Sequence, residues 1–316
     1  MQRLRNSADA VGDIEVLRWR LVADGYVFLP GYLDVNQISD VQGRLREGWA
    51  SVGWLTSPQT LTAAGRDLRF TRDSFATVYP AVQRVEQFHR LAHADRLVRL
   101  VSGLLGGEVF CHPAKVARIS PPSDGSRAFT RAHQDFVAMH VATDVLTAWI
   151  PLTACTPDRP GLRIIPGSHL NGFLRTAPSI PGARPFYLPV GDDDPRWATS
   201  DYDLGDLVVF HSLTVHGAGP NITDDARLSV DVRYQLVIDP MRAELSHPHG
   251  WPRIPDWDEL CGDWTDQRWV QAPPQVDLIP TVPDADLPQY LTTLVAPPSR
   301  LLHPGRQSGN SPTRTL

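Results

Sequence analysis

Residues 227–238 read RLSVDVRYQLVI, a run in which polar and apolar residues alternate. Successive side chains of a β-strand point to opposite faces of its sheet, so the run predicts a strand with one polar and one apolar face. The two faces would carry, respectively, Arg227, Ser229, Asp231, Arg233 and Gln235, and Leu228, Val230, Val232, Tyr234 and Leu236. The polar face could lie in solvent, or it could line the wet interior of a barrel whose outer side is covered by helices.

The chain ahead of this strand favours the barrel interior. Between about 108 and 240, short runs rich in Val, Ile, Thr and aromatic residues alternate with Pro and Gly turns, and we expect strands in the runs at 108–120, 144–153, 162–169, 185–190, 206–216 and 227–238. Such runs without intervening helices are typical of an antiparallel sandwich or barrel. Residues 14–48 predict a helix, a short strand and a second helix capped by Asp34, and residues 78–105 carry a helical period. These helices could cover the apolar face, so we expect a mainly β fold with flanking helices.

We expect a single domain over residues 1–295. It would combine a helical part at about 14–105, a β core at about 108–240 and a Pro- and Trp-rich segment at about 240–290. The composition of residues 296–316 is typical of a disordered tail.

Composition excludes several classes of function. The net charge of −5 over 316 residues gives no electrostatic reason to expect a nucleic acid or an anionic membrane as partner. The three cysteines have no short spacing, so neither a disulfide framework nor a zinc knuckle is encoded. The N-terminus lacks the apolar run of a signal peptide, and no apolar stretch of ~18 residues occurs. We therefore expect a cytoplasmic protein, whose oligomeric state the sequence does not determine.

One histidine pattern suggests a metal centre. Two histidines and one carboxylate can hold one face of an octahedral iron(II) and leave the other face open to co-substrate and O₂. His133 and Asp135 are separated by one residue, so on a strand both would point to the same face. His216, at the end of a second predicted strand, would supply the third ligand, and the glycines after it would allow a tight turn.

Two other histidine pairs are weaker candidates. His93 and Asp95 fall in a predicted helix, where positions i and i+2 point about 200° apart, so we expect His93 on the helix surface. His247 and His249 lie in a Pro-rich loop with no third ligand nearby.

At these residues the chain resembles the phytanoyl-CoA dioxygenase family of iron(II)- and 2-oxoglutarate-dependent oxygenases, which includes ectoine hydroxylases and tailoring enzymes of specialised metabolism. The resemblance spans about residues 25–238, and its segments occur in the family's order. They are GYVFLPGYLD, AHQDF around His133, AWIPLTACT, PGLRIIPGSH, GDLVVFHSLTVHGAGPN and ARLSVDVRYQ. The family fold is a double-stranded β-helix, a cupin-like jelly roll, which agrees with the strand pattern.

The resemblance implies a role for four residues. His133, Asp135 and His216 would bind iron(II). Arg227 would pair its planar guanidinium with the distal carboxylate of the co-substrate 2-oxoglutarate.

Other cofactor contacts are less sharply indicated. Trp149 would lie beside the co-substrate or in the ordinary core, and Ser229 could donate to the same carboxylate as Arg227. Ala218 stands where relatives often carry a small hydroxyl residue, so one hydrogen bond to the co-substrate would be missing or supplied by Ser229. Lys115, the only lysine of the chain, could reach the co-substrate or an anionic substrate, although a surface lysine is the commoner case.

Aromatic residues on two flanks could wall a substrate pocket or belong to the core. They are Phe70, Tyr79, Trp251, Trp257, Trp264 and Trp269.

The sequence thus predicts a dioxygenase that uses iron(II), 2-oxoglutarate and O₂ to oxidise a small-molecule substrate, releasing succinate and CO₂. Hydroxylation is the default outcome, while desaturation, epoxidation or epimerisation would need only a different substrate pose. One alternative is a cupin-like metalloenzyme that does not use 2-oxoglutarate, against which the position of Arg227, 11 residues after His216, argues. Another is a non-catalytic ligand-binding jelly roll, against which the intact triad argues.

Overall fold

The computed structural model describes residues 1–65, 68, 72–123, 130–174, 187–250, 252–282, 286, 289–290 and 293–302. Two mainly antiparallel β-sheets are packed together through a shared apolar core, which is the architecture of a jelly roll. In spatial order the larger sheet contains β2 (Tyr26–Leu29), β9 (Leu207–His211), β6 (Leu146–Pro151), β11 (Arg227–Leu236) and β3 (Val109–Cys111), with β4 (Val116–Ser120) also paired to β11. The smaller sheet contains β1 (Gln2–Arg3), β8 (Ala198–Thr199), β7 (Leu162–Ile164), β10 (His216–Ala218) and β5 (Thr130–His133). The predicted mainly β fold is confirmed.

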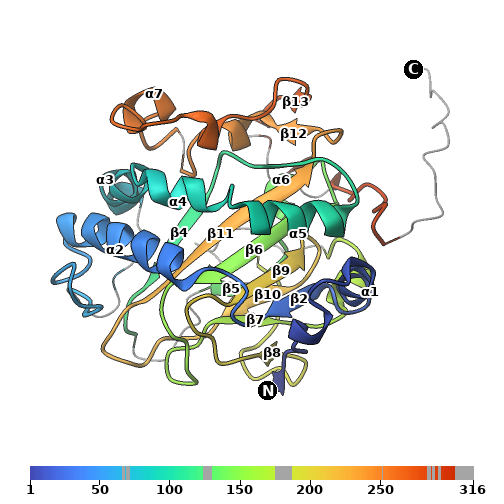
Figure 1. Ribbon diagram of the computed structural model, residues 1–316, viewed down its shortest axis with the longest axis horizontal. Coiled ribbons are helices and arrows are strands. Elements are labelled where there is room, and N and C mark those ends of the chain that lie inside the picture. Colours follow the sequence, from blue (N-terminus) through green and yellow to red (C-terminus); the bar gives the residue numbers. More distant parts are fainter. Residues whose placement is uncertain are drawn as a thin grey trace.

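Helices cover the outer face of the larger sheet, as Figure 1 shows for α2, α4 and α5 across β6 and β11. The helices are α1 (Ile14–Asp24), α2 (Val35–Ser51), α3 (Arg72–Gln83), α4 (Glu86–Leu91), α5 (Asp95–Leu105), α6 (Phe136–Met139) and α7 (Trp257–Leu260). A small parallel pair, β12 (Met241–Arg242) and β13 (Leu278–Ile279), lies beside α7 (Figure 1). In the described part of the chain, no helix has the length and apolar character needed to cross a membrane.

Local sequence signals explain where the first helices begin and end. The Asp34 side chain accepts a hydrogen bond from the backbone N–H of Asn36, which caps α2 as predicted. Gly25 ends α1 with φ of 82°, a left-handed conformation that favours glycine.

The region with a helical period at 78–105 does not form one continuous helix. Breaks after Gln83 and Leu91 divide it into α3, α4 and α5, because each short helix can bury its own apolar face while the chain turns between them.

Strand β11 confirms the interpretation of the alternating pattern. It pairs with β6 on one side and with β4 and β3 on the other, and all ten of its residues are buried. Leu228, Val230, Val232 and Tyr234 pack with the helices in the main hydrophobic core. The polar face therefore points into the space between the sheets and not into solvent.

Two predicted strands are interrupted. The run at 108–120 is divided into β3 and β4, and the run at 206–216 is divided into β9 and β10. His216 therefore begins a strand and does not end one, because the chain leaves the larger sheet after His211 and enters the smaller sheet at His216. The run at 185–190 is not a strand over residues 187–190, and its first two residues lie outside the described part.

The predicted disordered tail does not begin at 296. The buried carboxylate of Asp144 accepts hydrogen bonds from the hydroxyl of Ser299 and the backbone N–H of Arg300, so this part of the chain is fixed against the core. Residues 303–316 lie outside the described part.

Candidate metal centre and co-substrate pocket

The two candidate histidine ligands face each other across neighbouring strands. His133 ends β5, His216 begins β10, and the two are direct partners in the antiparallel register, with ring centroids 4.1 Å apart. In each ring, Nδ1 lies within hydrogen-bonding distance of the backbone oxygen two residues earlier. The distance is 2.9 Å from His133 to Arg131 O and 3.0 Å from His216 to Thr214 O. Because Nδ1–H donates to these carbonyls, Nε2 keeps its lone pair free for a metal.

Gly217 permits this approach of β10 to β5. A Cβ at Gly217 would lie 2.7 Å from the backbone oxygen of Thr130, which is closer than real Cβ atoms come. The glycine after His216 therefore serves close strand packing and not the tight turn that the sequence suggested.

Asp135 completes the triad, but not by strand alternation. It follows the end of β5 and has helical backbone angles (φ −63°, ψ −26°) at the start of α6. Its Oδ1 lies 3.7 Å from Nε2 of His133 and 3.8 Å from Nε2 of His216. The three ligand atoms lie within 4.8 Å of one another, and no other such metal-binding group occurs among the described residues. Two imidazole nitrogens and one carboxylate oxygen fit iron(II) with an open coordination face.

Arg233 and Thr147 hold the carboxylate of Asp135, and neither residue was predicted to have a role at the metal centre. Arg233 donates from Nε to Oδ2 and from Nη2 to Oδ1, both at 3.0 Å, and the hydroxyl of Thr147 donates to Oδ2 at 2.7 Å. Burial alone would raise the pKa of Asp135, but the Arg233 guanidinium holds that pKa well below its usual range. Oδ2 thus accepts two hydrogen bonds and Oδ1 only one, so Oδ1, which faces both histidines, keeps a lone pair for a metal.

The triad opens into a narrow cavity between the sheets. Its lining comprises Arg118, Thr130, His133, Trp149, Leu162, Phe210, His216, Gly217, Ala218, Arg227 and Asp231. Trp149 packs edge-on against Tyr202, with ring centroids 4.8 Å apart, so it belongs to the core between the sheets and also borders the cavity. Four of the residues that the sequence singled out for iron and co-substrate, His133, His216, Arg227 and Trp149, therefore meet at one place.

Two polar groups of β11 fit a bound carboxylate. Arg227 is buried and donates from Nη2 to the hydroxyl of Ser120, but it forms no ion pair with a carboxylate of the described residues. Burial lowers the pKa of this guanidinium. On the same face, the Ser229 hydroxyl is fully buried without a hydrogen-bond partner in the described structure. Buried charges and hydroxyls normally have partners, so both groups suit a dianionic co-substrate such as 2-oxoglutarate.

Lys115 does not lie at the triad or line its cavity. It lies just before β4, is completely buried, and donates from Nζ to the backbone oxygen of Trp269 at 2.6 Å. Burial lowers the pKa of its amine. The alternative of a surface lysine is therefore wrong, and the structure places the amine in the layer of α4 and the C-terminal segment, where no residue of the triad lies.

The competing histidine pairs do not form metal sites. His93 lies in the turn between α4 and α5 and not on a helix surface; its Nε2 is 3.1 Å from the Trp269 carbonyl. Burial, with the nearby charge of Lys115, lowers the pKa of His93 to about 4. His247 is paired with Asp256 at 2.9 Å, while the ring of His249 packs edge-on against Tyr79.

The described tryptophans of the C-terminal segment lie away from the cavity. Trp257 and Trp264 pack around the buried His89 of α4, and Trp269 packs on His93. None of them lines the cavity of the triad. Of the two alternatives, the structure favours packing against α4 and the turn after it over a wall of the substrate pocket for these three residues. Tyr79 is buried and stacks on Phe75, and Phe70 and Trp251 lie outside the described residues.

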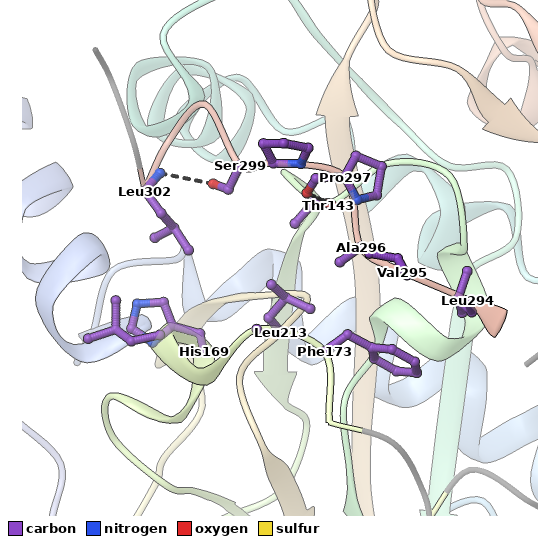
Figure 2. Close-up of a pocket in the computed structure, with 13 residues that line it drawn as sticks. Thr143, His169, Phe173, Leu213, Leu294, Val295, Ala296, Pro297, Ser299 and Leu302 are labelled. Carbon is purple, nitrogen blue, oxygen red and sulfur yellow. Dashed lines mark hydrogen bonds between the residues drawn. The ribbon is translucent and has the colours of Figure 1, made fainter. Parts of the chain in front are cut away.

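A second, larger cavity of about 470 Å³ lies where residues 294–302 pass over the core (Figure 2). Apolar side chains such as Phe173, Leu213 and Leu294 line it, and no acidic or guanidinium group of the described residues does so. Gln134, between the two ligands of the HxD pattern, donates to the backbone oxygens of Gly172 and Leu213 at its border. None of the triad residues and neither Arg118 nor Arg227 lines this second cavity.

Comparison with known proteins agrees with this geometry. The family model described as "Phytanoyl-CoA dioxygenase (PhyH)" matches residues 21–229, which include the triad, Arg227 and Ser229. The chain belongs to the phytanoyl-CoA dioxygenase family. The predicted family, and with it the enzyme class of iron- and 2-oxoglutarate-dependent dioxygenases, is confirmed.

Two bacterial enzymes are among the proteins of similar sequence, and one is among those of similar structure. It is 26% identical over 257 residues to the 1-deoxypentalenic acid 11-beta-hydroxylase of Streptomyces exfoliatus, covering 76% of this chain and 84% of that protein. It is 22% identical over 245 residues to the ectoine dioxygenase of Stutzerimonas stutzeri (strain A1501), covering 71% and 77%. The epimerase SnoN, solved with Fe³⁺, α-ketoglutarate and nogalamycin RO, matches with a TM-score of 0.53 and 23% identity over 87% of this chain and 97% of that one. This structural likeness confirms the fold.

Proposed function

We propose that this dioxygenase hydroxylates a small-molecule metabolite, with His133, Asp135 and His216 as iron ligands and Arg227 as the residue that binds 2-oxoglutarate. The observation that carries the proposal is that both histidines of a two-histidine, one-carboxylate set line the same cavity as the buried Arg227, which forms no ion pair among the described residues. The similarity to a hydroxylase of 1-deoxypentalenic acid supports a small organic metabolite as the substrate class. A cytoplasmic location and a single domain over residues 1–295 remain predictions from the sequence.

Each side chain has a defined part in this function. When bound, iron(II) with 2-oxoglutarate and O₂ supplies the power to oxidise an unactivated C–H bond. Arg227 presents a planar fork to the distal carboxylate of 2-oxoglutarate, and Ser229 offers a hydroxyl on the same face of β11. Trp149 walls the cavity and excludes water from it. Arg233 keeps Asp135 ionised and aimed at the metal.

The test is O₂-dependent formation of succinate from 2-oxoglutarate by the iron(II)-loaded protein. We expect slow succinate formation by the protein alone and faster formation when a metabolite library contains the substrate. Binding of iron without any binding or turnover of 2-oxoglutarate would favour the cupin-like alternative. Absence of iron binding would favour a non-catalytic jelly roll.

A further inference from the structure

A second guanidinium, that of Arg118, lines the same cavity as the triad and has no part in the proposed function so far. Arg118 lies on β4, directly opposite Ser229 of β11. Its side chain is 25% exposed, whereas that of Arg227 is fully buried. Arg118 is therefore the cation of this cavity that an incoming molecule can reach.

The contacts of Arg118 with the described residues involve only one of the three guanidinium nitrogens. Only Nε donates to a side chain of the described residues, namely to Oδ2 of Asp231, which faces it from β11. The two Nη groups have no hydrogen-bond partner in the described structure. Asp231 itself is buried, and through this contact it fixes the plane of the guanidinium. The side chain is thus held in place with two donors available to a ligand.

The charges of the site also leave room for an anion. Among the described residues, the charged side chains that line the cavity are Arg118, Arg227 and Asp231, and the ligand Asp135 is paired with Arg233. These three arginines and two aspartates leave one positive charge when the histidine ligands are neutral. Iron(II) would add two positive charges and 2-oxoglutarate two negative ones, so one positive charge remains. A further monoanionic group would neutralise the loaded site, whereas a cationic substrate would be repelled.

We propose that the free edge of Arg118 binds a carboxylate in the active-site cavity, and that this carboxylate belongs to the substrate. This inference rests on the proposed function and specifies its substrate class as small carboxylic acids. A planar guanidinium makes two parallel hydrogen bonds to a carboxylate, which an amide or ester of the same shape cannot match in charge. The 1-carboxylate of 2-oxoglutarate carries the same chemistry and is the other possible source of the anion.

The experiment uses the full chain loaded with iron(II) and 2-oxoglutarate under anaerobic conditions. A library of small carboxylic acids, each paired with its primary carboxamide, is screened for binding, and the charge-transfer absorption of the iron–2-oxoglutarate complex reports co-substrate affinity. We expect at least one acid to bind at least ~10-fold more tightly than its amide, and Arg118→Gln to remove that preference. The affinity for 2-oxoglutarate should stay unchanged in this variant.

Two further variants keep the test decisive. Arg118→Gln leaves Asp231 buried without its partner, so the double variant Arg118→Gln/Asp231→Asn removes both charges together and should show the same loss of acid preference. Arg44→Gln, on the exposed surface of α2, is the matched control and should keep the preference of the parent.

The outcomes separate the two sources of the carboxylate and the two proposals. Weaker binding of 2-oxoglutarate by the Arg118 variants, with acid preference unchanged, would assign the carboxylate to 2-oxoglutarate and overturn the substrate class. Parental affinity for both in the folded double variant, or no acid preference in the parent protein, would overturn the role of Arg118 altogether. If the parent forms no succinate under O₂, the proposed function fails instead, and this measurement is independent of the acid screen.

Discussion

Strand β11 presents two faces that are equally buried but chemically opposite. On the inner face, Arg227 lines the cavity of the triad, and Arg233 holds the ligand Asp135. On the outer face, Leu228 and Val232 pack under the helices in the main hydrophobic core. All these residues alternate along one strand of ten residues.

The two faces therefore contribute differently, the outer one to stability and the inner one to function. Burial of apolar side chains on the outer face favours folding by roughly 25 cal/mol per Å² removed from water. Burial of charges on the inner face opposes folding unless each charge is paired, and a paired buried charge is often no more stabilising than an apolar residue. We therefore expect inner-face changes to impair binding and turnover while the fold persists, and outer-face changes to lower stability while chemistry persists.

The largest effect is expected for the ligands that meet the inner face. His133→Ala, Asp135→Ala and His216→Ala should each abolish iron binding and succinate formation, because two ligands cannot hold an ion in a site already open on one face. Metal analysis and a coupled succinate assay measure this. His247→Ala, outside the cavity, is the control and should keep both the iron content and the rate of succinate formation of the parent. Parental iron content in a ligand variant would remove that residue from the triad.

Arg227→Ala should raise KM for 2-oxoglutarate by at least ~30-fold, since loss of one partner of a buried charge pair typically costs ~2–5 kcal/mol. Iron binding should remain. Arg227→Lys should restore only part of the affinity because an ammonium lacks the planar fork. Steady-state kinetics at varied 2-oxoglutarate measure the effect. A folded Arg227→Ala variant with the KM of the parent would show that this arginine is structural.

Arg233→Met should weaken iron binding by ~10–100-fold, the usual range for groups that orient a metal ligand. The reason is that Asp135 lies beyond the end of β5, so Arg233 and Thr147 set its direction. Iron titration measures the effect, and KM for 2-oxoglutarate at saturating iron should be unchanged. Arg233→Lys should recover part of the iron affinity. Lower thermal stability with parental iron affinity would contradict a positioning role.

Leu228→Ala tests the opposite face beside Arg227. Removing this buried side chain from the main core should lower the free energy of unfolding by ~2–5 kcal/mol. Denaturant unfolding measures it, and KM for 2-oxoglutarate at low temperature should equal that of the parent. A clear change in KM with little loss of stability would mean that the two faces are not functionally separate.

The smallest effect is expected for Tyr234→Phe, on the outer face beside Arg233. The Tyr234 hydroxyl donates to the buried backbone oxygen of Ala92 in the turn between α4 and α5. Loss of this hydrogen bond should lower the free energy of unfolding by ~1 kcal/mol, with iron affinity unchanged. Comparison of its unfolding curve with that of Arg233→Met would show whether neighbouring residues on opposite faces differ as expected.

The sequence alone determined the properties that depend on neighbouring residues. Alternation along 227–236 assigned Arg227 and Leu228 to opposite faces, because the pleat of a strand has a strict period of two. The residue types at His133, Asp135 and His216 indicated iron, because the donor set of a metal follows from side-chain chemistry. The cap at Asp34 was equally local.

Tertiary structure alone decided what depends on packing between distant segments. Asp135 has no strand to direct it, and its partner Arg233 stands 98 residues away, so no local period could reveal their contact. Lys115 donates to the backbone oxygen of Trp269, 154 residues away, in the layer behind the larger sheet. Neither residue therefore lines the cavity of the triad, where the sequence had suggested a role for each. Local stereochemistry fixes which way a side chain points from its own strand or helix, but only the packing of two sheets and their helices fixes what it meets there.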